Sequence, residues 1–145
     1  MPPEGVQLKI WLSDDERIVY YDYDGPYVES YSRHVLEKLR REAMESDTPE
    51  KVLVTVFDVR DVDFSTLTAD EWRESVGWFA EQRRNADDDR PVIFVTNKGF
   101  NFGMVRMRSL LDTALESHIV KTMHEANTLA NELMSAPRNL VSDET

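Results

Sequence analysis

Hydrophobic and polar residues follow one another along this chain in patterns that predict both strands and helices. Residues 52–57 (VLVTVF) form an unbroken apolar run, which predicts a strand buried on both faces, and residues 92–96 (VIFVT) predict a second strand of this kind. Residues 6–12 alternate between apolar and polar side chains, as expected for a half-buried strand at a sheet edge. A short polar turn leads to the β-rich run 17–23, which favours an antiparallel hairpin broken at residues 24–26 (DGP).

Four further segments carry apolar residues at intervals of three or four, the spacing of an amphipathic helix. The second begins with Thr68 and Glu71 in the arrangement of a capping box. The third is predicted to begin at an Asn101 cap and to bury Met104, Met107, Leu110, Leu111, Ala114 and Leu115. The other helices are predicted at residues 27–44, 68–84 and 125–135, with a short strand at 118–123.

The resulting order, β-β-α-β-α-β-α-β-α, predicts an α/β fold. Strands that alternate with helices indicate a mixed, mostly parallel sheet of about five strands, with an N-terminal antiparallel hairpin and four helices. The length of 145 residues is that of one domain, which we assign to residues 1–136, with residues 137–145 as a flexible C-terminal tail.

Composition and charge narrow the classes of partner. The formal net charge is −11, and because a nucleic-acid partner requires a basic face, none is expected. The chain has no cysteine, and we see neither a signal peptide nor an apolar stretch long enough to span a bilayer. These features predict a cytoplasmic protein without membrane insertion.

Three aspartates follow the buried strand: Asp58, Asp61 and Asp63. Several carboxylates at one point are what Mg²⁺ or Ca²⁺ requires, so a metal-dependent or acid/base enzyme is one hypothesis. Their spacing is not that of a calcium loop, which needs a glycine and a distal glutamate. We therefore interpret them as solvated surface acids and expect no metal and no cofactor.

Other catalytic patterns are also incomplete. Asp14, Asp15, Asp58, Thr96 and Lys98 are spaced somewhat like the acidic, hydroxyl and lysine positions of a response-regulator receiver. A strand follows Asp15 where a receiver has its first helix, however, and Lys98 comes one strand too early. The chain also has no nucleophile elbow, no glycine-rich phosphate loop and no metal-binding histidine spacing, so we expect no enzymatic activity.

Hydroxyl and aromatic residues supply the remaining candidates. Ser65 and Thr66 precede the second helix, where a phosphate would meet free backbone N–H groups, whereas Thr68 is accounted for as the cap. Trp11, Tyr21 and Tyr23 are expected to be exposed and to supply an interface, for which a second copy of the chain is one candidate partner. A predicted pocket between the second and third helices has the lining Trp72, Phe79, Phe100, Phe102 and Met104.

The segment VLVTVFDVRDVDFSTLTADEW resembles the central strand and following loop of STAS / SpoIIAA-like domains, and the element order is also similar. The C-terminal part, NFGMVRMRSLLDTALESHIVKTMHEANTLANELM, looks like the ending of an uncharacterised bacterial subgroup of that family. In anti-anti-sigma members the loop carries an Asp-Ser-Ser-Gly signature whose serine is phosphorylated by a partner kinase. By position Ser65, or less closely Thr66, corresponds to that serine, although here Phe64 precedes it and Leu67 follows.

Two functional hypotheses follow. The first is a non-catalytic STAS-like regulatory domain that binds a protein partner or a small anionic ligand through the loop bearing Asp58, Asp61, Asp63, Ser65 and Thr66. The alternative is a carrier that holds a small apolar ligand in the predicted pocket.

Overall fold

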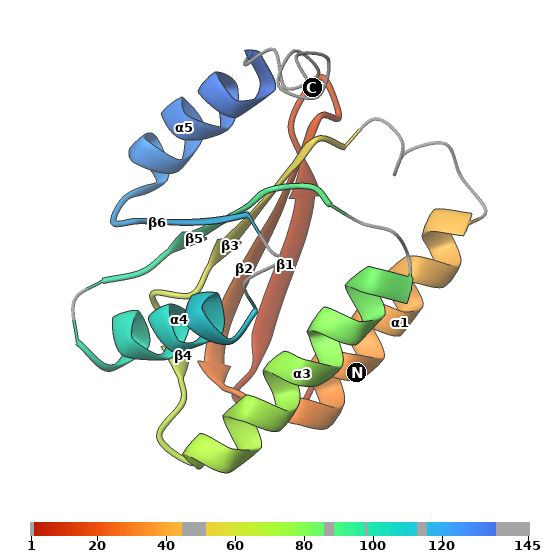
Figure 1. Ribbon diagram of the computed structural model, residues 1–145. Helices are drawn as coiled ribbons and strands as arrows, with labels where there is room; N and C mark the ends of the chain where they lie inside the picture. The colour runs from red at the N-terminus through yellow and green to blue at the C-terminus, as the bar shows by residue number, and fades with distance from the viewer. Residues whose placement is uncertain (1, 45–51, 86–88, 98, 113–115, 136–145) are drawn as a thin grey trace, which may run out of the picture.

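The computed structural model describes residues 2–44, 52–85, 89–97, 99–112 and 116–135. Within these ranges the chain forms six strands and four helices, and Figure 1 shows how they are arranged. The strands are β1 (Gln7–Leu12), β2 (Ile18–Pro26), β3 (Val54–Asp58), β4 (Val62–Asp63), β5 (Val92–Val95) and β6 (Ser117–Val120). The helices are α1 (Glu29–Met44), α3 (Ala69–Asn85), α4 (Phe100–Leu111) and α5 (Met123–Ser135).

The strands form one mixed sheet in the order β1-β2-β3-β5-β6, and the two-residue strand β4 pairs with the end of β2. β1 and β2 are antiparallel, whereas the pairs β2–β3, β3–β5 and β5–β6 are parallel. This confirms the predicted α/β class, with its antiparallel N-terminal hairpin and mostly parallel sheet. The strand that the sequence did not predict is β4.

The predicted break at residues 24–26 is wrong, because β2 continues through Pro26. The backbone N–H of Gly25 donates to the carbonyl oxygen of Asp61 (3.1 Å), and the N–H of Tyr27 donates to that of Asp63 (2.8 Å). Gly25 has φ 112°, and a Cβ at this position would lie 2.1 Å from the backbone oxygen of Gly5. The glycine therefore permits a close approach of two backbones instead of ending the strand.

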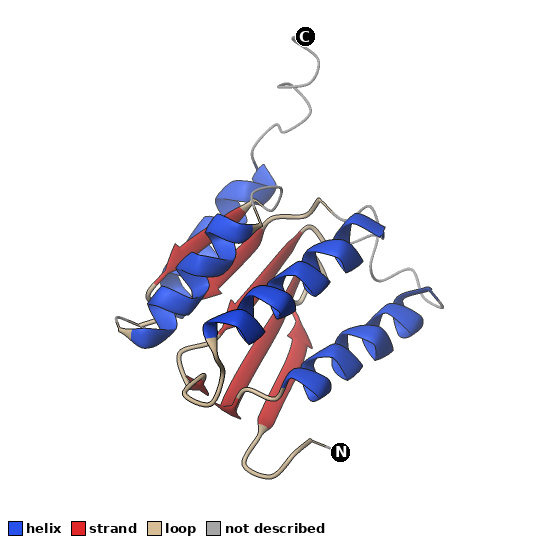
Figure 2. Cartoon of the chain, turned by 60° about the horizontal axis from the view of Figure 1, so that its bottom comes forward, coloured by secondary structure: helices blue, strands red, loops and turns tan. Residues whose placement is uncertain are grey.

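Helices cover both faces of the sheet, as Figures 1 and 2 show. On one face α5 lays Ala126 and Ala130, both fully buried, on alternate residues of the strands. The hydroxyl of Tyr20 donates to Oδ1 of Asn127 on α5 (2.7 Å). The hydrophobic core between α5 and the sheet consists of Ile18, Tyr20, Val54, Val56, Ile93, Val95, Ala126 and Ala130.

The opposite face lies beneath α1, α3 and α4, and its side chains include several aromatic rings. Tyr21 stacks on Phe57 with ring centroids 4.8 Å apart, and Phe57 stacks on Phe94 at 5.6 Å. Tyr21 and Tyr23 are half-buried on this face, so the prediction that they are exposed interface residues is wrong. Trp11, by contrast, is 42% exposed on the edge strand β1.

The capping box at the start of α3 is confirmed in both directions. The N–H of Glu71 donates to Oγ1 of Thr68 (3.1 Å), and the N–H of Thr68 donates to Oε1 of Glu71 (2.9 Å). α4 begins differently from the prediction, because Gly99, not Asn101, is its N-cap residue.

The expected buried face of α4 is partly wrong. Leu110 and Leu111 are 68% and 47% exposed, whereas Met104, Val105 and Asp112 are buried. The inward side of the helix follows the i, i+4 spacing of residues 104, 108 and 112, which places two charged residues, Arg108 and Asp112, where the hydrophobic pattern had none. Ala114 and Leu115 lie outside the described residues, as does the predicted tail 137–145.

None of the described helices is long and apolar enough to cross a membrane.

Candidate functional site

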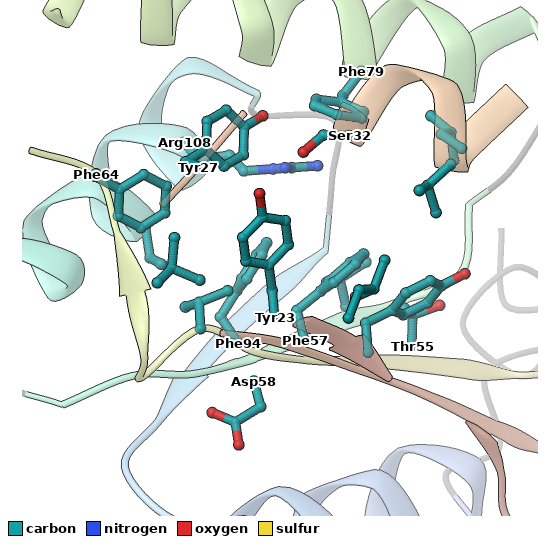
Figure 3. A pocket seen from close by; sticks show the side chains of 18 of the residues that line it. Tyr23, Tyr27, Ser32, Thr55, Phe57, Asp58, Phe64, Phe79, Phe94 and Arg108 are labelled. Atoms are coloured by element: carbon teal, nitrogen blue, oxygen red, sulfur yellow. The ribbon is translucent and has the colours of Figure 1, made fainter. Parts of the chain in front are cut away.

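A cavity of about 220 Å³ lies between the sheet and the helices α1, α3 and α4. Its floor is the aromatic face of β2, β3 and β5, and Val35, Leu36 and Leu39 of α1 form part of its wall. Figure 3 shows the rings of Tyr23, Phe57 and Phe94 on one side and Phe79 of α3 on the other. Further lining residues include Leu8, Tyr21, Tyr27, Ser32, Thr55, Val62, Phe64, Trp72, Val92 and Val105.

Arg108 of α4 extends into this mainly apolar space (Figure 3). Its guanidinium carbon lies 5.2 Å from the centroid of the Phe79 ring and 5.4 Å from that of Phe94, in the range of cation–π contacts. Its Nε atom is buried and has no hydrogen-bond partner. Burial lowers the pKa of Arg108 from its ordinary value.

A buried hydroxyl chain lies near Arg108 and connects α1 to α3. The hydroxyl of Tyr27 is 3.0 Å from Oγ of Ser75, which donates to Oε1 of Glu29 at 2.9 Å. Burial raises the pKa of Tyr27 to about 12, although its contact with Ser75 acts in the opposite direction. The second carboxylate oxygen of Glu29, Oε2, is buried without a hydrogen-bond partner.

The cavity is displaced from the pocket that the sequence predicted between the second and third helices. Trp72 and Phe79 line it, as predicted. Met104 is buried but does not line it, and Phe102 is 37% exposed. The side chain of Phe100 lies outside the described part of the structure. Arg108 was missed, although its position four residues after Met104 on one helix face is a signal that the sequence contains.

The predicted loop between β3 and α3 is held in place by hydrogen bonds from two directions. Nδ2 of Asn101 donates to the carbonyl oxygens of Val59 and Val62, at 2.8 Å each. Within the loop, the N–H of Ser65 donates to Oδ1 of Asp63 (2.9 Å), and this contact lowers the pKa of Asp63. The loop is thus anchored by a residue that the sequence suggested as a helix cap.

The structure separates the five predicted loop residues into two groups. Asp58 is 8% exposed, and its carboxylate accepts two hydrogen bonds from the side chain of Arg60, from Nε at 2.9 Å and from Nη2 at 2.8 Å, and a third from the backbone N–H of Arg60 at 3.2 Å. Figure 3 shows this carboxylate pointing to the opposite side of the sheet from the cavity. The other four residues, Asp61, Asp63, Ser65 and Thr66, are exposed.

Asp58 lies beside Asp22, its partner residue on β2. Burial, and next the negative charge of Asp58, raise the pKa of Asp22, while Lys9 acts against them. Among the described residues, no group of three or more histidines, aspartates or glutamates is arranged to hold a metal ion. The chemistry available here is therefore that of exposed acids and of a partly buried ion pair between Asp58 and Arg60.

Neither a protein-family model nor a curated protein matches this chain. The similarity to STAS-like domains accordingly remains a prediction from the sequence pattern, and the function must be argued from the site itself.

Proposed function

We propose that this protein binds a small, mainly apolar ligand in the cavity beneath α1 and α3, as a carrier or as a ligand-dependent regulator. The observation that carries the proposal is the cavity itself, with its aromatic floor. Protein interiors are normally packed without voids larger than a water molecule. An apolar cavity of about 150 Å³ is known to bind benzene, and the volume of about 220 Å³ found here exceeds it.

The position of the cavity also supports ligand binding. α1 contributes Val35, Leu36 and Leu39 to the wall, and these side chains are only half-buried. A ligand would cover them and would fill the space between this helix and the stacked rings of Tyr21, Phe57 and Phe94. Because a ligand that binds only the native state stabilises it, occupation should raise the unfolding temperature.

Native mass spectrometry of freshly purified protein tests this proposal. We expect a bound small molecule in the wild type and its absence in Thr55→Phe, since Thr55 lines the cavity and a phenyl ring would fill it. Thr55→Val is the matched control, because it keeps the side-chain volume and should retain the ligand. If the wild type carries no ligand and no apolar compound in a panel stabilises it, the proposal fails.

We propose a second, separate function for the loop between β3 and α3: binding of a protein partner, controlled by Ser65. What supports it is that Ser65 and Thr66 are exposed on a loop whose backbone is already fixed by Asp63 and Asn101. A phosphate on Ser65 would add negative charge beside the start of α3, where the helix dipole favours it. An affinity pull-down with Ser65→Asp should change the set of bound proteins, whereas Ser135→Asp, the same change on exposed α5, should not. Identical sets for wild type and Ser65→Asp would contradict this second proposal.

A further inference from the structure

The charges that line the cavity differ in sign from the charge of the whole protein. The chain has a formal net charge of −11, yet the charged residues that line the cavity are Asp58, Arg83, Arg90 and Arg108. The one acid among them, Asp58, is bound to Arg60 and points away from the cavity (Figure 3). Arg83 is likewise bound, to Asp112, so the argument rests on the charge of Arg108. A cation in the wall favours an anionic ligand over a cationic one.

Arg108 has no counter-ion in contact with it among the described residues. Asp112, one turn further along α4, is bound to Arg83 of α3 in a buried ion pair. Glu29 of α1 accepts hydrogen bonds from Ser75 (2.9 Å) and from Nε of Arg33 (3.3 Å). The two acids whose charges act on Arg108, Asp112 and Glu29, are thus each paired with another arginine.

Such an arrangement is unfavourable in the empty protein. A buried charge is stable when it is paired and hydrogen-bonded, and an arginine does not escape by losing its proton. The rings of Phe79 and Phe94 stabilise the cation through their faces but accept none of its N–H donors in the way that an oxygen would. The site therefore lacks an acceptor with negative charge.

We infer that the ligand is a monocarboxylate with an apolar body, whose carboxylate accepts hydrogen bonds from Arg108. This inference rests on the proposed ligand-binding function and specifies its substrate class. The planar guanidinium presents N–H donors with the spacing of two carboxylate oxygens, so a carboxylate is the acceptor that matches it best. The hydroxyl of Ser32 also lines the cavity, as Figure 3 shows, and is a second donor for a bound carboxylate.

The cavity also sets the size of the ligand. Scaled from the benzene-sized cavity of about 150 Å³, a volume of about 220 Å³ accommodates roughly nine non-hydrogen atoms. Octanoate is close to this size, and its alkyl chain would lie on the rings of Tyr21, Phe57 and Phe94.

Isothermal titration with three probes of equal chain length, octanoate, octanol and octylamine, tests the inference. We expect octanoate to bind the wild type about ten- to hundredfold more tightly than octanol, the range for a hydrogen bond to a charged group, and octylamine to bind most weakly. In Arg108→Met the preference for octanoate over octanol should disappear while octanol still binds. Arg106→Met, on the exposed side of the same helix, is the control and should keep the wild-type preference.

The outcomes separate this inference from the proposed function. Equal binding of octanol and octanoate to the wild type would overturn the carboxylate assignment and leave apolar ligand binding intact. Binding of none of the three probes would overturn both. Unliganded Arg108→Met should also unfold at a higher temperature than the unliganded wild type, because it removes a cation whose buried Nε has no hydrogen-bond partner. An unfolding temperature below that of the wild type would show that Arg108 is already stabilised by the protein and would contradict the inference.

Discussion

The indole Nε1 of Trp72 donates a hydrogen bond to the backbone carbonyl oxygen of Met104, 2.9 Å away in the protein interior. This contact connects α3 to α4 at the end of the cavity. The ring of Trp72 also makes edge contacts with Tyr27 and Phe64, with centroids 5.6 and 5.4 Å away. One side chain therefore holds together both helices and the loop that precedes α3.

We expect Trp72→Phe to lower the free energy of unfolding by about 2–4 kcal/mol. The substitution leaves the Met104 carbonyl oxygen buried without a donor and creates a void where the larger ring was. Urea unfolding followed by circular dichroism measures the change. Trp11→Phe is the control, because Trp11 is 42% exposed and its replacement should change stability by less than about 0.5 kcal/mol. Equal changes for the two substitutions would show that the hydrogen bond from Trp72 to Met104 does not contribute to the free energy of unfolding.

Two aspartate–arginine pairs in the chain differ in burial, and we expect them to differ in their contribution to the free energy of unfolding. Asp112 and Arg83 form a pair whose side chains are 3% and 13% exposed, whereas Asp70 and Arg73 form one with exposures of 92% and 58%. We expect Asp112→Asn to cost about 3–5 kcal/mol of stability, because it leaves the arginine charge buried and unpaired. Asp70→Asn should change stability by less than about 1 kcal/mol. Chemical unfolding of both variants makes the comparison, and a small effect of Asp112→Asn would show that Arg83 finds another partner.

Much of the fold was predictable because it depends on short-range patterns. The continuous apolar run that contains β3, the alternation in β1 and the Thr68–Glu71 capping box each fix an element within a few residues. β4 was not predictable in this way, since a strand of two residues has no periodicity. It exists because β2 continues through Pro26 and pairs with it, Gly25 opposite Val62 and Pro26 opposite Asp63, which is a tertiary contact.

The candidate site was less predictable, for a related reason. The hydrophobic pattern selected Leu110 and Leu111 as inward residues of α4, yet Arg108 and Asp112 lie on that side. A charged residue counts as polar in any pattern, and only the pairing of Asp112 with Arg83 across two helices reveals why it is buried. The cavity lies between α1 and the sheet, and no local pattern in the sequence predicts how these two elements are spaced.

Asp22 and Asp58 lie side by side on the sheet, and we expect removal of the charge of Asp22 to stabilise the protein. Burial and the neighbouring charge of Asp58 raise the pKa of Asp22, so the folded protein holds this proton more tightly than the unfolded chain does. Stability therefore falls as the pH rises from 3.8, the ordinary value, through the raised pKa of the folded state. We expect Asp22→Asn to unfold at a higher temperature than the wild type at neutral pH, and the difference to vanish below the ordinary value. The exposed Asp14→Asn controls for the change in net charge, and an equal gain from it would contradict the assignment to Asp22.

The raised pKa of Tyr27 predicts that the protein loses stability in alkaline solution. Its pKa rises from 10.0 to about 12 on folding, chiefly through burial. Between these two values the unfolded chain loses the phenol proton and the folded protein keeps it, so stability falls as the pH rises through this window. Two pH units correspond to about 3 kcal/mol lost by the upper end. Ultraviolet titration of tyrosinate should show a step near pH 12 that is absent in Tyr27→Phe, and the variant should lose less stability across the window than the wild type does. A step near pH 10 in the folded wild type that Tyr27→Phe removes would show that this phenol is accessible to solvent, and that the cavity is open at Tyr27.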